Sequence, residues 1–225
     1  MLLVKVPKIT NRLQYTFGYL FTFLYGVKVQ FTLSDDEYLS ASCPRFEYAH
    51  EPCCKEGLFF GSSDLLFRRS IEGLDMDQVR SEYDLFPVYH LSSVLPYDPF
   101  ASSFYMLSRY EEYLPFRKDL HGRFGASESL AFRKGFLQKA VVNVWASEVI
   151  EILKNYYPGL SLKQTNYKYI PTVDVDLAYS YLHKGLVRTL GGYAKSLIQG
   201  DYAMFRQRTR VLMGREKDPF DSFDS

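Results

Sequence analysis

The chain has 225 residues, of which 47% are hydrophobic, 17% aromatic and 24% charged. This composition is typical of a folded globular protein of one or two domains and excludes a disordered chain. The formal net charge of +1 gives no field for binding a polyanion, so we expect no nucleic-acid partner.

The first element that we expect is a short strand over residues 2–6, followed by a helix that begins near Asn11 and ends before Gly26. Leu13, Phe17, Leu20 and Leu24 recur at helical spacing, which favours an amphipathic helix packed on a core. The segment is too short and too polar to cross a bilayer, so we expect no transmembrane segment. A peripheral membrane contact by this helix is the alternative.

The cysteine content indicates a reducing compartment. The three cysteines are odd in number, and two of them are neighbours, a pattern that suits neither disulfides nor a zinc hairpin. Because no cleavable signal sequence is recognisable either, we expect a cytoplasmic protein.

Alternation and apolar runs predict several strands after this helix. Residues 27–33 alternate apolar and polar side chains, as a half-buried strand does. Residues 45–49 and 58–60 are further short strands, and the apolar run over residues 85–91 suits an inner strand.

Helical signals dominate the next part of the chain. Asp98 and Pro99 suit the cap and first position of a helix over residues 100–114. Residues 121–134 are polar and contain glycine, which favours a loop. Asn143 could cap a helix that ends before Pro158.

The last third of the chain begins with a predicted strand over residues 167–176. We place a domain boundary before it, giving an N-terminal domain over residues 1–165 and a second domain over residues 166–225. Two helices follow, one ending at Gly200 and one running from Asp201 to Gly214.

Asp174 and Asp176 form the one constellation in this sequence that suits catalysis. Two residues apart on a strand, their side chains would share a face, and sites of α/β folds lie where strands end. One carboxylate could hold a metal ion while the other takes a proton from water. The structural alternative is a pair of solvated acids or caps of the next turn.

Several enzyme classes begin a site with two spaced acids. Glycosyltransferases use Asp-x-Asp to hold a metal and a nucleotide sugar, which stays an alternative here. Phosphatases of the haloacid dehalogenase type require Thr or Val two residues after the second acid, where this chain has Ala178.

The run Thr172-Val173-Asp174-Val175-Asp176 is similar to the first motif of NodB-type polysaccharide deacetylases, usually Thr-Phe-Asp-Asp. In the family the two acids are adjacent, whereas Val175 separates them here. The upstream region resembles the N-terminal region that precedes deacetylase domains in Bacteroidetes proteins. The segments that carry this second resemblance are 98–114, 121–124 and 218–221.

This resemblance implies an α/β fold in which a mixed α/β domain precedes the first strand and helices of an incomplete (β/α) deacetylase barrel. It implies that Asp174 is the general base and that Asp176 binds a divalent metal, zinc or similar. The reaction would be hydrolysis of acetyl groups from an acetylated glycan. The N-terminal domain would be accessory, packing on the catalytic domain or helping to hold glycan.

The resemblance also implies that this chain is inactive by itself. The family completes its metal site with two histidines one helical turn apart, and no two of the four histidines here have that spacing. We therefore expect the metal only in the full-length protein. A non-catalytic glycan-binding or interaction module is the alternative.

Three other features have structural interpretations that we prefer. His90 suits the edge of a core. Arg109, Glu111 and Glu112 suit a charged helix face, although they could also line a sugar cleft. The basic stretch 206–217 suits the outer face of a helix.

Overall fold

The chain forms two compact units, Met1–Asn166 (unit 1) and Tyr167–Ser225 (unit 2). The computed structural model describes residues 1–74, 85–163, 168–172, 174 and 176–221. Unit 1 is a mixed α/β domain, which confirms the fold class expected for the N-terminal part.

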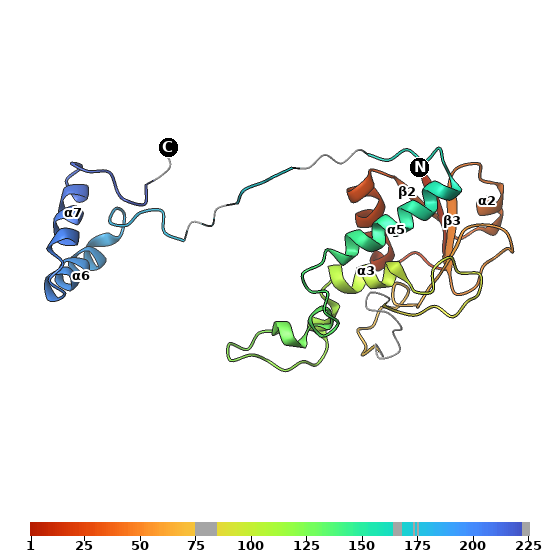
Figure 1. Ribbon diagram of the computed structural model, residues 1–225, viewed down its shortest axis with the longest axis horizontal. Helices are drawn as coiled ribbons and strands as arrows, with labels where there is room; N and C mark the ends of the chain where they lie inside the picture. Colours follow the sequence, from red (N-terminus) through yellow and green to blue (C-terminus); the bar gives the residue numbers. More distant parts are fainter. Residues whose placement is uncertain (75–84, 164–167, 173, 175, 222–225) are drawn as a thin grey trace. The chain divides into compact units, whose positions relative to one another are not determined.

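Unit 1 is built on a four-stranded parallel sheet in the order β2-β1-β3-β4 (Figure 1). The strands are β1 (Leu2–Lys5), β2 (Val29–Thr32), β3 (Arg45–Ala49) and β4 (Phe59–Gly61). Their positions agree with the strands that the sequence predicts there. The order changes direction between β1 and β3, which in open parallel sheets marks the edge where ligands bind.

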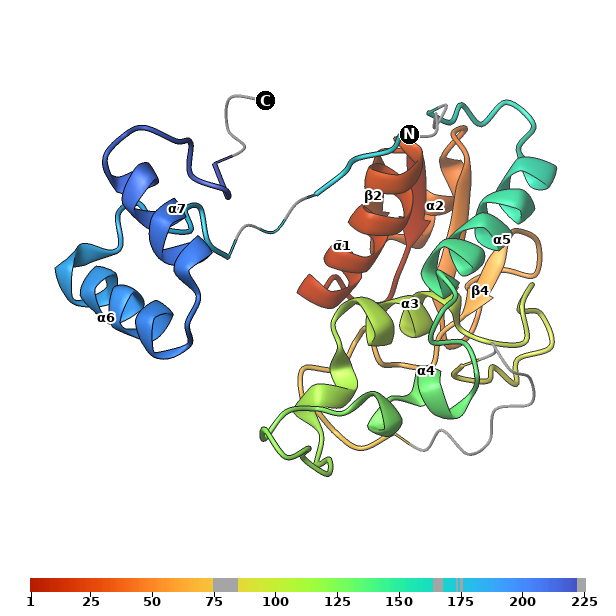
Figure 2. The same ribbon diagram turned by 60° about the vertical axis from the view of Figure 1, so that its left-hand side comes forward.

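Helices cover both faces of this sheet. Figure 2 shows α1, α3 and α5 along one face, while α2 contacts β1 and β2 from the other. The helices of unit 1 are α1 (Asn11–Phe17), the π-helix η1 (Gly18–Phe23), α2 (Asp35–Ser40), α3 (Pro99–Leu107), the 3₁₀ helices η2 (Tyr110–Tyr113) and η3 (Ala126–Glu128), α4 (Leu130–Arg133) and α5 (Val141–Tyr156).

Aromatic rings fill the space between the sheet and the three helices. Phe100 of α3 stacks on Phe17 with centroids 4.5 Å apart and on Phe46 at 5.8 Å. Tyr48 and Trp145 are also fully enclosed in this core. Large buried rings of this kind provide most of the hydrophobic stabilisation of a domain.

Unit 1 differs from the sequence prediction in its second half. The strand expected over residues 85–91 is wrong, because Pro87 makes only an isolated bridge to Tyr97 and Phe86 has φ +61°. The helix expected to reach Leu114 ends at Leu107, and Arg109 with φ +52° separates it from η2. The expected loop over residues 121–134 contains η3 and α4, and Ala140, not Asn143, precedes α5.

Unit 2 contains two helices, α6 (Gly185–Ile198) and α7 (Tyr202–Leu212), as the sequence predicts. Asp201 caps α7 through the backbone N–H of Met204. Among the described residues of unit 2, the buried side chains are few: Tyr181, Ser196, Val211 and Asp218. In the part of the chain that the structure describes, no helix has the length and apolarity needed to cross a membrane.

Candidate functional site

The two acids that the sequence singles out lie on an irregular segment. Residues 168–172, 174 and 176 have no strand conformation, so the predicted strand is wrong for these residues. Asp174 and Asp176 are both exposed. The predicted positions 173 and 175 lie outside the described residues.

The physical reason is that, within the ranges that the structure describes, this segment pairs with no other strand. A strand needs a second chain segment to accept and donate its backbone hydrogen bonds, and Pro171 has no N–H to give. Tyr169 is 77% exposed and Ile170 is 74% exposed, so the apolar side chains that suggested a buried strand face solvent. A run of apolar residues in a sequence does not show which other part of the protein would cover those side chains.

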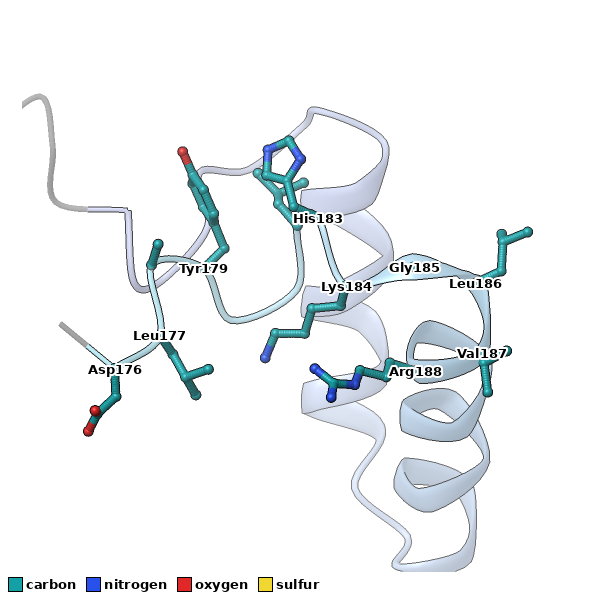
Figure 3. Close-up of a pocket in the computed structure, with 11 residues that line it drawn as sticks. Asp176, Leu177, Tyr179, His183, Lys184, Gly185, Leu186, Val187 and Arg188 are labelled. Carbon is teal, nitrogen blue, oxygen red and sulfur yellow. The ribbon is translucent and has the colours of Figure 1, made fainter.

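Asp176, but not Asp174, borders a hollow of about 480 Å³ in unit 2. Its wall is formed by the turn over residues 177–184 and by the start of α6. Figure 3 shows Lys184 and Arg188 extending toward the Asp176–Leu177 segment, whereas the carboxylate of Asp176 points outward. His183 contributes to the wall with the left-handed φ of +56°.

The fit of these residues to a metal ion is incomplete. Among the described residues, no group of three or more His, Cys, Asp or Glu side chains could hold a metal ion. A catalytic zinc takes three protein ligands and leaves one position open. Asp174 and Asp176 would supply two oxygen ligands at most, so the described residues do not fit a complete metal centre.

Asp218 fixes the shape of this hollow, and sequence reasoning missed its role. Its carboxylate accepts hydrogen bonds from the backbone N–H groups of Ser180 and Tyr181, both at 2.7 Å, and of Leu182 at 3.0 Å. A fourth N–H, from Phe220, donates at 3.1 Å. Desolvation raises the pKa of Asp218, but the four donors outweigh it and lower the pKa to about 2.

The clamp by Asp218 therefore holds the turn that carries two wall residues, Tyr179 and His183. A signal for it exists in the sequence: the tripeptide Asp-Pro-Phe at 218–220 repeats the tripeptide at 98–100, where we predicted a cap. A carboxylate that accepts backbone hydrogen bonds, as predicted for Asp98, could therefore have been predicted for Asp218 as well.

Arg208 of α7 joins the same turn to α6. Its guanidinium lies 5.0 Å from the ring centroid of Tyr181 and 5.5 Å from that of Tyr193. A Cβ at Gly192 would lie 1.5 Å from Nη1 of Arg208, so this glycine provides the space that the guanidinium fills. Of the basic stretch predicted to be an outer helix face, Arg206 and Arg210 are exposed, but Arg208 is part of this packing.

Unit 1 has a polar cluster near the carboxyl ends of β1 and β3. Lys5 pairs with Asp35 at 2.5 Å and lies opposite the buried Glu47 in the sheet. Burial lowers the pKa of Lys5, but pairing with Asp35 and proximity to Glu47 outweigh it, so the pKa is raised. Burial, together with hydrogen bonding to Glu47, raises the pKa of Cys53 to about 12.

This cluster does not suit nucleophilic catalysis. The thiolate is the reactive form of cysteine, and a pKa near 12 keeps Cys53 protonated at neutral pH. Its backbone N–H also donates to Glu47 at 2.8 Å. The cluster is best explained as a satisfied polar layer that positions the loop after β3.

A second hollow, of about 380 Å³, is lined by tyrosines at the opposite, amino end of β3. Tyr38, Tyr156 and Tyr157 contribute rings to its wall together with Arg45. Arg45 lies over the ring of Tyr38 at 5.4 Å, and the hydroxyl of Tyr157 donates to the Arg45 carbonyl at 2.7 Å. Aromatic faces of this kind suit flat or sugar-like ligands.

The other sequence candidates have structural roles. The ring of His90 packs on Phe59, with centroids 5.2 Å apart, in agreement with a core-edge position. Arg109 pairs with Glu112, and Glu111 accepts from the backbone N–H of Leu130. These contacts favour the internal ion pairs of a helix face over a sugar cleft.

Comparison with known families decides the affiliation of unit 1. A family of unknown function, DUF7033, matches residues 2–158. The chain belongs to this family. The DUF7033 region lies wholly inside unit 1 and stops before the segment that carries Asp174 and Asp176. No curated protein and no solved structure matches the chain.

Proposed function

We propose that this chain is the N-terminal part of a metal-dependent, polysaccharide deacetylase-like protein that removes acetyl groups from an acetylated glycan in the cytoplasm. The DUF7033 region is its accessory domain, and unit 2 contributes the first motif of the catalytic domain. The observation that carries the proposal is the motif of residues 172–176. Its two carboxylates, of Asp174 and Asp176, are solvent-accessible, and Asp176 borders the hollow of unit 2.

The two acids have different tasks in this proposal. Asp174 takes the proton from the attacking water, and Asp176 is a metal ligand. A divalent ion, when bound, would polarise the acetyl carbonyl. The described residues provide two ligands rather than three, so this chain by itself does not catalyse the reaction.

Cytoplasmic action is supported by the state of the cysteines. Cys43, Cys53 and Cys54 are all free thiols. Proteins of reducing compartments keep thiols in this form, whereas small secreted domains use them in disulfides.

Calorimetric titration of the chain with Zn²⁺ or Mn²⁺ tests the proposal. We expect weak binding of one ion, with a dissociation constant on the order of a millimolar, the weak end for carboxylate sites. Asp174→Asn and Asp176→Asn should each abolish it, because each removes one of two ligands. Glu151→Gln, an exposed carboxylate on α5, is the matched control and should bind as the unaltered chain does.

Two results would contradict the proposal. Metal binding that survives both Asn variants would move the site elsewhere, and the absence of any binding would favour a module without chemistry. Robust acetate release by this chain, abolished in Asp174→Asn, would overturn the inactivity of the isolated chain.

A second candidate function is glycan binding by the DUF7033 region without catalysis. The tyrosine-lined hollow favours it, because Tyr156 is 52% exposed and its ring, held edge-to-face against Tyr157 at 5.0 Å, forms part of the wall on which a sugar face could stack. In that case an acetylated oligosaccharide binds without metal. Tyr156→Ala should weaken the binding about tenfold, while Tyr169→Ala in unit 2 should leave it unchanged.

A further inference from the structure

The apolar side of α6 has no partner among the described residues. Five aliphatic side chains of this one helix are more than half exposed: Leu186 83%, Val187 86%, Leu190 67%, Leu197 54% and Ile198 86%. Scattered single apolar residues are normal on a surface, but a continuous set on one helix marks an interaction site.

These side chains form one stripe. At 3.6 residues per turn they fall within an arc of about 120°, the width of an amphipathic helix face. Figure 3 shows the first two, Leu186 and Val187, extending from the start of α6 in a different direction from Arg188, at the rim of the hollow that all three residues line.

The stripe is not the face that α6 presents to α7. The contacts with α7 come from a different side of the helix, where Gly192 meets Arg208, and from Tyr193 at the border of the stripe, which bonds Thr209 at 3.0 Å. Ser196, on that same side, is the buried residue of α6. The hairpin is therefore closed by Gly192, Ser196 and the Tyr193–Phe205 ring pair, whose centroids are 4.8 Å apart, and its aliphatic stripe remains exposed.

The charged residues of the helix that carries the stripe have one sign. α6 contains two cations, Arg188 and Lys195, and no acidic residue. Arg188 and Lys195 are seven residues apart and therefore lie on one side of α6, about 60–80° beyond the Ile198 border of the stripe at 3.6 residues per turn. A helix with an aliphatic face and basic edges is the pattern of helices that lie in the surface of an anionic membrane.

We propose that unit 2 binds the surface of anionic membranes by inserting the aliphatic stripe of α6, with Arg188 and Lys195 contacting the lipid headgroups. This inference goes beyond the proposed deacetylase-like function and uses none of its acids. Pairing of the stripe with that of a second copy is less favourable than membrane binding. Two-fold antiparallel pairing of α6 would bring Arg188 and Lys195 of both copies to the same side, where their positive charges repel. An anionic surface instead compensates these charges.

The test is cosedimentation of the full chain with vesicles. We expect binding to vesicles of phosphatidylcholine and phosphatidylglycerol in equal parts, and at least tenfold weaker binding to pure phosphatidylcholine. Each cation near an anionic surface strengthens binding about fivefold, so Arg188→Glu with Lys195→Glu should weaken it more than tenfold. Raising the salt from about 0.1 M to about 1 M should also release the protein.

Stripe variants separate insertion from simple charge attraction. Leu190→Asp and Leu197→Asp should each weaken binding about tenfold or more, because an ionised side chain cannot enter the acyl region. Val144→Asp and Lys154→Glu, at exposed positions of α5, are the matched controls and should bind normally. Circular dichroism shows whether each variant keeps its helices.

Three outcomes would overturn the proposal. The first is no cosedimentation of the unaltered chain, and the second is equal binding to both kinds of vesicle. The third is a dimer in light scattering that Leu190→Asp dissociates, which would assign the stripe to a second copy. None of these outcomes bears on metal binding by Asp174 and Asp176, so the two proposals fail independently.

Discussion

The tripeptide Asp-Pro-Phe occurs in both units and is used in two different ways. Asp98 in unit 1 is fully buried and accepts five hydrogen bonds, from Tyr48, from Ser63 twice, and from the first turn of α3. Asp218 in unit 2 is 3% exposed and accepts from four backbone N–H groups. Each carboxylate binds amides close in sequence and joins them to a distant segment.

The surroundings decide what the same tripeptide contributes. Around Asp98 the aromatic core excludes water, and this burial raises its pKa although five donors oppose the effect. Around Asp218 there is little core, and the four amides lower the pKa to about 2. Unit 1 is thus held by apolar packing with a satisfied polar centre, whereas unit 2 depends on a polar clamp for its order.

The largest effect that would test this comparison is expected at Asp98. Asp98→Ala leaves a buried tyrosine hydroxyl, two groups of the half-buried Ser63 and two helix amides without their acceptor, so unit 1 should lose about 3 kcal/mol or more. Fluorescence of Trp145, the single tryptophan, reports unit 1 during denaturation. Ser63→Ala removes one of the five hydrogen bonds and should cost about 1 kcal/mol; an equal loss in both variants would contradict the role of Asp98 as a centre.

A smaller and pH-dependent effect is expected at Asp218. Because its folded pKa lies below that of an unfolded chain, its contribution is present above about pH 4 and is lost as the pH falls toward 2. Burial of Asp98 acts with the opposite sign: its contribution is complete below about pH 4 and declines as the pH rises through its raised pKa. Acidification should therefore loosen unit 2 through this clamp.

Hydrogen exchange of the amides of Tyr181 and Leu182 measures the clamp directly. Their protection should fall between about pH 4 and pH 2 in the unaltered chain and should be low at every pH in Asp218→Ala. The loss in the variant should be about 2 kcal/mol. If the protection of these amides depends neither on pH nor on Asp218, the carboxylate does not hold this turn.

The smallest effect is expected at the adjacent glycines of α6. Gly191→Ala meets nothing within 4 Å and should stabilise the helix by about 0.5–1 kcal/mol. Gly192→Ala gains the same helix propensity but displaces Arg208 from its tyrosines, so the net change should be close to zero. Thermal melts followed at the helix band of circular dichroism measure both, and equal stabilisation would show that the Arg208 packing contributes nothing.

The sequence predicted those elements of the fold whose determinants lie close together along the chain. Asp98 and Pro99 predicted the start of α3 because a cap bonds amides two and three residues away. The strands of unit 1 were found since each alternation or apolar run spans its own element. In contrast, neither Phe86 nor Arg109 is a residue type that favours a left-handed φ, so no local pattern predicted either break.

The candidate site followed the same rule. The motif around Asp174 could be recognised from five consecutive residues, but its conformation depends on a neighbouring strand that no local pattern reveals. The role of Asp218 joins segments 36–38 residues apart. The stripe of α6 shows the same limit, because periodicity shows which residues share a face of a helix and not what covers that face.

In unit 1 the strands of the sheet precede the helices α3 and α5 along the chain, and this order matters during synthesis on the ribosome. All four strands are complete by Gly61, but α3 and α5, which cover the aromatic face of the sheet, come from residues 99–156. A chain leaving the ribosome at about 5–20 residues per second therefore carries, for several seconds, an apolar sheet face that only α1 and η1 can cover. Phe100 and Trp145 arrive last, so nascent chains stopped before them should be the species that chaperones bind.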